Sequence, residues 1–145
     1  IAIVLPVSIL MVFIAMKYAG VTANIVALSG IAIAIGTMVD LAIILVENIV
    51  KYREDHPDMK LLDAIYTGSA EVSTAILTAV TTTIISFVPV FMLQGAEGKL
   101  FIPLAFTKTF ALIAAVIVTL LIIPAITYVL FSIRKKSYRN YRSFF

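Results

Sequence analysis

The 145-residue chain is 62% hydrophobic and only 13% charged, and its mean hydropathy is +1.12. These values exclude an ordinary soluble domain of this size and predict a protein of the lipid bilayer. The absence of cysteine excludes disulfides and thiolate metal sites. The net charge of +3 comes from Lys and Arg gathered at the ends of apolar runs, so we expect no nucleic-acid partner. We also expect no cofactor.

Four apolar runs are long enough to cross a membrane, and the predicted spans are residues 1–19, 25–50, 71–93 and 101–131. The first break is a short turn in which Thr22 or Asn24 can cap the next helix. Apolar positions at helical spacing within residues 61–70 predict a short amphipathic interfacial helix that leads into the third span. A tight polar turn precedes the last span, where Pro103 fits the first helical turn. The predicted fold class is therefore an all-α membrane protein with four transmembrane helices plus a short cytoplasmic interfacial helix.

The basic residues indicate the orientation of these spans. Eight Lys and Arg lie within residues 51–60 or after residue 133, whereas the other side has only Lys17, Lys99 and Lys108. The positive-inside rule places the 51–70 loop and the C-terminus in the cytoplasm. Residues 1–133 then form the membrane part, and residues 134–145 form a basic amphipathic segment on the anionic inner leaflet. RNA binding is the alternative interpretation of that segment.

The segment GTMVDLAIILVEN, residues 36–48, places Asp40 in the middle of an apolar span. An ionised carboxylate there costs about 2.5 to 3.5 kcal/mol on insertion scales. The group can stay protonated, or it can face a protein interior that supplies a cation. We expect Asp40 to face inward, because Gly36 and Glu47 share its side of the helix and small residues recur four apart. A site that alternates between these states takes up and releases protons, whereas the plainer alternative is a hydrogen bond to a neighbouring helix.

Other polar residues in the spans carry weaker signals. Glu47 and Glu71 lie near cytoplasmic helix ends, where we expect solvated carboxylates. The third span contains a set of hydroxyl side chains: Ser73, Thr74, Thr78, Thr81, Thr82, Thr83 and Ser86. They can bond to carbonyls of their own helix, or they can line a hydrated proton path beside Asp40. The sequence leaves both alternatives open.

Two long stretches, NIVALSGIAIAIGTMVDLAIILVEN and VPVFMLQGAEGKLFIPLAFTKTFAL, resemble the N-terminal half of resistance-nodulation-division (RND) transporters, especially their heavy-metal efflux branch. The resemblance covers transmembrane helices three to six and the start of the cytoplasmic helix that follows. It implies that this chain, which opens in mid-run at Ile1, is an internal piece of a longer polypeptide. Asp40 falls on the proton-relay aspartate of the family, and it is followed by Leu41 where multidrug members carry a second aspartate. The relay lysine of the family belongs to the second half of such proteins.

The resemblance also implies partners. Members of the family are proton antiporters of the bacterial inner membrane that work as homotrimers with a periplasmic adaptor and an outer-membrane channel. The copper and silver members are thought to pass soft cations along paired methionines, which suit such ions by softness. Met38 falls on one of these positions, whereas Val26 stands on another. Met38 is thus a candidate contact on a metal path or a flexible apolar filler, and zinc, cobalt, nickel or cadmium remain open as cargo.

Four functions therefore compete. The first is a secondary active transporter, and not an enzyme, that exports metal cations in antiport with protons. The second is a multidrug or lipid exporter of the same family. The third is a non-catalytic membrane scaffold or sensor domain, which would tolerate loss of the Asp40 carboxylate. The fourth, an intramembrane aspartyl protease, needs two carboxylates that share a proton, and the spans hold only one deep acid.

Overall fold

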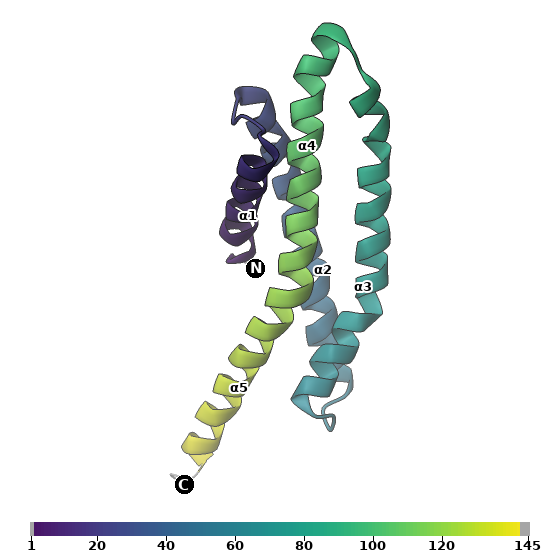
Figure 1. Ribbon diagram of the computed structural model, residues 1–145. Helices are drawn as coiled ribbons and strands as arrows, with labels where there is room; N and C mark the ends of the chain where they lie inside the picture. Colours follow the sequence, from purple (N-terminus) through teal and green to yellow (C-terminus); the bar gives the residue numbers. More distant parts are fainter. Residues whose placement is uncertain (1, 143–145) are drawn as a thin grey trace.

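A computed structural model describes residues 2–142 of the chain, with side chains up to Ile133. In this part all regular structure is helical (Figure 1). The elements are α1 (Val4–Ala19), α2 (Ile25–Asp55), α3 (Leu61–Ser86), the 3₁₀ helix η1 (Val88–Met92), α4 (Gly95–Ile117), the π-helical turn η2 (Val118–Ile122) and α5 (Ile123–Arg142). The predicted all-α membrane bundle is confirmed.

Helix α2 lies at the centre of the bundle, with its main contacts to α4 and α3, while α1 packs mainly on α4. Helices α1 and α3 run in one direction, and α2 and α4 run in the other (Figure 1). The α2–α3 loop and the end of α5 therefore lie at one end of the molecule, and the other two turns lie at the opposite end. This arrangement agrees with the prediction that the 51–70 loop and the C-terminus share one side of the membrane.

The turn between α1 and α2 forms as its sequence predicts. Gly20 ends α1 with a φ of 67°, a left-handed conformation that glycine adopts without a steric penalty. The Asn24 Oδ1 atom accepts a hydrogen bond of 2.8 Å from the amide of Ala27 and so caps α2. Of the two predicted cap residues, Asn24 fills the role.

Two predicted boundaries are wrong. Residues 61–70 are not a separate interfacial helix but the first turns of α3, because no proline interrupts Leu61–Ser86. Helix α4 begins at Gly95, earlier than predicted. The negative charge of Glu97 in its first turn is favourable at the positive end of the helix dipole. Pro103 consequently lies inside α4 and not in its first turn.

Three helical stretches are long and apolar enough to cross a membrane: Ile25–Asp55, Leu61–Met92 and Gly95–Ile133. The fourth, α1, is apolar but has 16 residues. Helix α5 continues the last stretch without a break to Arg142. The side chains of residues 134–142 and all of residues 143–145 lie outside the described part, so a lipid-bound basic segment remains a prediction.

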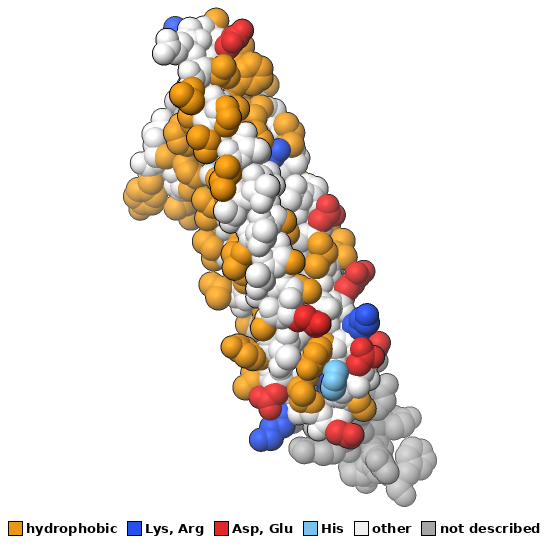
Figure 2. All heavy atoms as spheres, turned by 90° about the vertical axis from the view of Figure 1, so that its right-hand side faces the viewer, with side chains coloured by type: hydrophobic (Ala, Val, Ile, Leu, Met, Phe, Trp, Pro, Cys, Tyr) orange, Lys and Arg blue, Asp and Glu red, His pale blue; other side chains and the backbone are white. Residues whose placement is uncertain are grey.

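Charged side chains gather at the end of the molecule that carries the α2–α3 loop, whereas apolar side chains cover much of the visible remainder (Figure 2). Within the loop, Nη1 of Arg53 donates hydrogen bonds to the carbonyls of His56 and Pro57, both at 2.8 Å, and of Met59 at 3.2 Å. His56 stacks on Tyr52 with ring centroids 4.4 Å apart. One guanidinium thus holds three carbonyls of the turn, which orders the connection between α2 and α3.

Replacing Arg53 by alanine should loosen this loop, because three carbonyls lose their common donor. Net hydrogen-bond contributions of about 1 kcal/mol predict protease cleavage within residues 56–60 that is faster by about three- to tenfold. Limited proteolysis of the full-length protein in detergent measures this rate. Lys51→Ala is the matched control, since Lys51 is exposed on the same helix end. Equal cleavage rates in the two variants would contradict the role of Arg53.

Candidate functional site

Helix α2 has two faces of different character. Its buried face packs against the other helices and consists of Ala27, Gly30, Ile31, Ala34, Met38, Leu41, Ala42, Leu45 and Ile49. Its exposed side, here named the open face, contains residues that recur three or four apart: Ile33, Gly36, Asp40, Ile44 and Glu47. This spacing keeps them on one side of the helix. Gly36 and Glu47 thus share the side of Asp40, as the sequence predicts.

Within this chain the stripe does not face the other helices. Asp40 is exposed and lies on the side of α2 opposite its buried face, so an orientation toward a protein interior stays a prediction. The reason lies in the two pairs of small residues on α2. Gly30 and Ala34 are buried in the bundle, whereas Ala32 and Gly36 are exposed. The second pair leaves the backbone accessible on the side of Asp40, as close packing by another helix requires.

The crossing of α2 and α4 fixes the orientation of this face. A β-carbon on Gly30 would lie 2.8 Å from the carbonyl oxygen of Leu104 and closer still to the hydroxyl of Thr107. Thr107 is fully buried, and its hydroxyl donates to the carbonyls of Pro103 and Leu104 in its own helix. The two backbones therefore meet with no room for a side chain, which turns Asp40 outward.

A second interhelical contact, not predicted from the sequence, joins α2 to α3 below Asp40. The Nδ2 atom of Asn48 donates to the carbonyl of Gly68 at 2.7 Å and to Oε2 of Glu71 at 3.1 Å. Gly68 allows this approach, because a β-carbon there would lie 3.2 Å from the α-carbon of Ile49. The sequence signal for this contact was Asn48 itself, an amide side chain next to Glu47 at the end of the apolar span. Glu47 and Glu71 are both exposed, in agreement with the expectation of solvated carboxylates.

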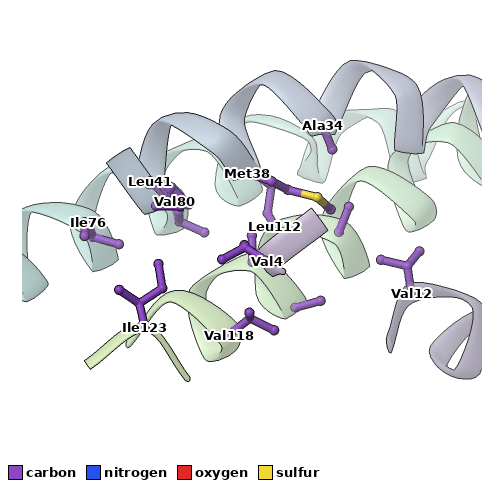
Figure 3. Close-up of a cluster of buried hydrophobic side chains, with 14 of the residues drawn as sticks. Val4, Val12, Ala34, Met38, Leu41, Ile76, Val80, Leu112, Val118 and Ile123 are labelled. Carbon is purple, nitrogen blue, oxygen red and sulfur yellow. The ribbon is translucent and has the colours of Figure 1, made fainter. Parts of the chain in front are cut away.

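Met38, two residues before Asp40, lies in a different environment. Its side chain is fully buried and points into an apolar cluster that includes Ala34, Leu112 and Val118 (Figure 3). Among the residues described, no group of three or more His, Cys, Asp or Glu side chains is placed to hold a metal ion. Met38 and Asp40 thus belong to opposite faces of α2. This position suits apolar packing, and a contact with a passing soft cation stays a prediction.

The hydroxyl side chains of α3 mostly bond to their own helix. Thr78 donates to the carbonyl of Thr74 and Thr82 donates to that of Thr78, each at 2.8 Å. Ser73, Thr83 and Ser86 make equivalent bonds three or four residues back. These bonds favour the intrahelical alternative over a hydrated path, because the hydroxyl protons are already donated.

Asp40 lies in the middle of an apolar helix, on a face that also carries Gly36. Both residues belong to the sequence segment that resembles RND transporters. The whole chain, residues 1–145, also matches the AcrB/AcrD/AcrF family. The chain belongs to this family of RND transporters. It therefore belongs to a family of multi-pass membrane transporters.

The sequence identity of this chain is higher to a cation efflux protein than to a multidrug resistance protein. The cation efflux system protein CusA of Escherichia coli (strain K12) is 43% identical over 129 residues, which cover 83% of this chain and 12% of CusA. The multidrug resistance protein MdtC of Photorhabdus laumondii is 31% identical over 144 residues, or 99% of this chain and 14% of MdtC. The swarming motility protein SwrC of Bacillus subtilis is 34% identical over 134 residues. The chain thus spans about one eighth of these relatives.

Proposed function

We propose that this chain is the proton-binding part of an RND pump that exports heavy-metal cations in antiport with protons. The observation that carries the proposal is the position of Asp40, an acid in the middle of an apolar span on an accessible face of a packed helix. Intramembrane acids are costly and commonly mark ion or proton pathways. The 43% identity to CusA supports a cation as cargo.

In the proposed mechanism, Asp40 acts through its charge. The open face receives a helix from the rest of the polypeptide that presents a cation, a lysine by the family resemblance. Deprotonated Asp40 pairs with this cation, because an isolated charge in the bilayer is unfavourable. Protonation removes the negative charge, releases the cation and changes the packing of α2 against its neighbour. Proton uptake on one side of the membrane and release on the other then drive the transport cycle.

The proposed assembly and location follow the resemblance of the chain to RND transporters. The pump lies in the bacterial inner membrane, with the α2–α3 loop and the end of α5 in the cytoplasm. It works as a homotrimer with a periplasmic adaptor and an outer-membrane channel. Residues 134–145 carry five cations and lie on the anionic inner leaflet.

A multidrug exporter is the second candidate, and the similarity to MdtC supports it. Deletion of the gene for the full-length protein separates the two. We expect the deletion strain to become sensitive to one or more of copper, silver, zinc, cobalt, nickel and cadmium, and to keep its tolerance to dyes and detergents. Growth inhibition series measure both. Sensitivity to dyes and detergents but to no metal would refute metal export and support the drug exporter.

A further inference from the structure

The junction between α4 and α5 contains a π-helical turn, Val118–Ile122, with regular α-helix on both sides. Turns of this kind are rare, and many of them occur at functional sites. Pro124 lies two residues after the end of this turn, and in a regular α-helix its ring would clash with the carbonyl of Leu120. The wider turn gives this ring room. The helix changes direction near the junction, and α5 leaves the bundle (Figure 1).

Thr119, inside the π turn, is fully buried, and its hydroxyl has no hydrogen-bond partner. Other threonines in these helices, such as Thr78 and Thr107, donate to a carbonyl of their own helix. Ser8, on the buried stripe of α1 that packs toward α4 and the π turn, is also fully buried and unpartnered. A buried hydroxyl without a hydrogen-bond partner is unfavourable, so the conformation of this junction leaves two hydrogen bonds unformed.

The π turn packs directly against the helix that carries Asp40. Val118 begins the turn and Ile123 follows it, and both belong to the same buried cluster as Met38 and Leu41 (Figure 3). Met38 and Leu41 stand within two residues of Asp40 along α2. A displacement of α2 at Asp40 therefore reaches the π turn through packed side chains, without an intermediate element.

We propose that the π turn is a two-state hinge that passes the movement of α2 to α5, and that Thr119 is the positioning residue that balances its two states. In the described state the Thr119 hydroxyl is unpartnered. In the other state the residues around Thr119 wind as a regular α-helix, while the turn at Leu120–Pro124 stays wide for the proline ring. The hydroxyl then donates to the carbonyl of Ala115, and the direction of α5 changes. This inference rests on the proposed proton-driven cycle, for which it names the moving element.

The variant Thr119→Val in the full-length protein tests the hinge, because it removes the hydroxyl and keeps the shape. The described state loses an unpartnered group and the other state loses a hydrogen bond. We expect a midpoint of thermal unfolding that is higher by up to about 1 °C and a metal efflux rate that is lower by about 5- to 30-fold. Thr119→Ser keeps the hydroxyl and should transport at nearly the wild-type rate.

Thr109→Val is the matched control, since the hydroxyl of Thr109 is also buried and unpartnered but lies on a regular turn of α4. It should raise the unfolding midpoint without slowing efflux. A lower midpoint in Thr119→Val, or a higher midpoint with unchanged efflux as in Thr109→Val, would overturn the hinge. The proposed proton role fails separately, if Asp40→Asn transports normally, and the comparison of the two threonine variants does not depend on that result.

Discussion

Asp40→Asn in the full-length protein should abolish metal tolerance while the protein still accumulates in the membrane at its normal level. Asparagine has nearly the same shape as aspartate and can form hydrogen bonds, but it neither carries a negative charge nor binds a transportable proton. Because Asp40 lies on the open face of α2 and contributes nothing to the packing of α1, α3 and α4, the substitution leaves this bundle intact. Metal tolerance in a strain that lacks the wild-type gene, together with quantification of membrane protein, measures the effect.

Glu47→Gln provides the control for charge at this face. Glu47 lies two turns nearer the α2–α3 loop on the same stripe and is exposed near the predicted cytoplasmic surface. Glu47→Gln should change metal tolerance little, because water solvates a carboxylate at a helix end and the charge needs no cationic partner. Normal tolerance in Asp40→Asn would instead support the scaffold or sensor interpretation.

Gly30→Ala should destabilise the membrane domain, because the added methyl group overpacks the crossing of α2 and α4. The added carbon would lie 2.8 Å from the Leu104 carbonyl and would overlap the Thr107 hydroxyl, so α2 and α4 must separate. Overpacking of this kind costs about 1 to 3 kcal/mol. We expect less folded full-length protein after extraction in mild detergent and a lower midpoint of thermal unfolding.

A second substitution checks that the crossing is the cause. Thr107→Ala removes the atom nearest to the new methyl group, so the pair Gly30→Ala and Thr107→Ala should recover part of the lost stability. Thr107→Ala alone should have a small effect, because its hydroxyl bonds only within α4. No recovery in the double variant would show that α2 and α4 do not meet at Gly30.

The sequence predicts the helices well, because apolar runs of sufficient length have few alternatives in a bilayer. Helix ends are harder to predict. Residues 61–70 are polar enough to suggest a separate helix. Hydropathy, however, indicates whether a residue lies in water or lipid, and it does not show whether the helix continues through it. Helix α3 continues through the predicted boundary because Gly68, the one weak helix former there, is packed against α2.

The candidate site was predictable in composition but not in direction. Periodicity places Gly36, Asp40 and Glu47 on one stripe, but two pairs of small residues could have formed the inner contact. The choice depends on what α4 presents, and only the close approach of Gly30 to Leu104 and Thr107 decides it. Asp40 therefore lies on the open face of α2 and not in the interior of the four helices.

The π turn has no signature in hydropathy, because Val118–Ile122 is as apolar as its surroundings. Pro124 was the available signal, yet a proline inside a membrane helix can be accommodated in several ways. The pairing of Asn48 with Gly68 and Glu71 likewise needs the register of α2 against α3, which residue spacing within one helix does not give.

In the proposed mechanism, protons move through Asp40 in exchange for metal. The direct test uses purified full-length protein in liposomes with a pH-sensitive dye inside and a gradient of the metal whose toxicity the gene deletion exposes. The wild-type protein should move protons opposite to the metal, and Asp40→Asn should move neither, while Glu47→Gln remains active. Metal-coupled proton movement at the wild-type rate in Asp40→Asn would contradict the proton role of Asp40.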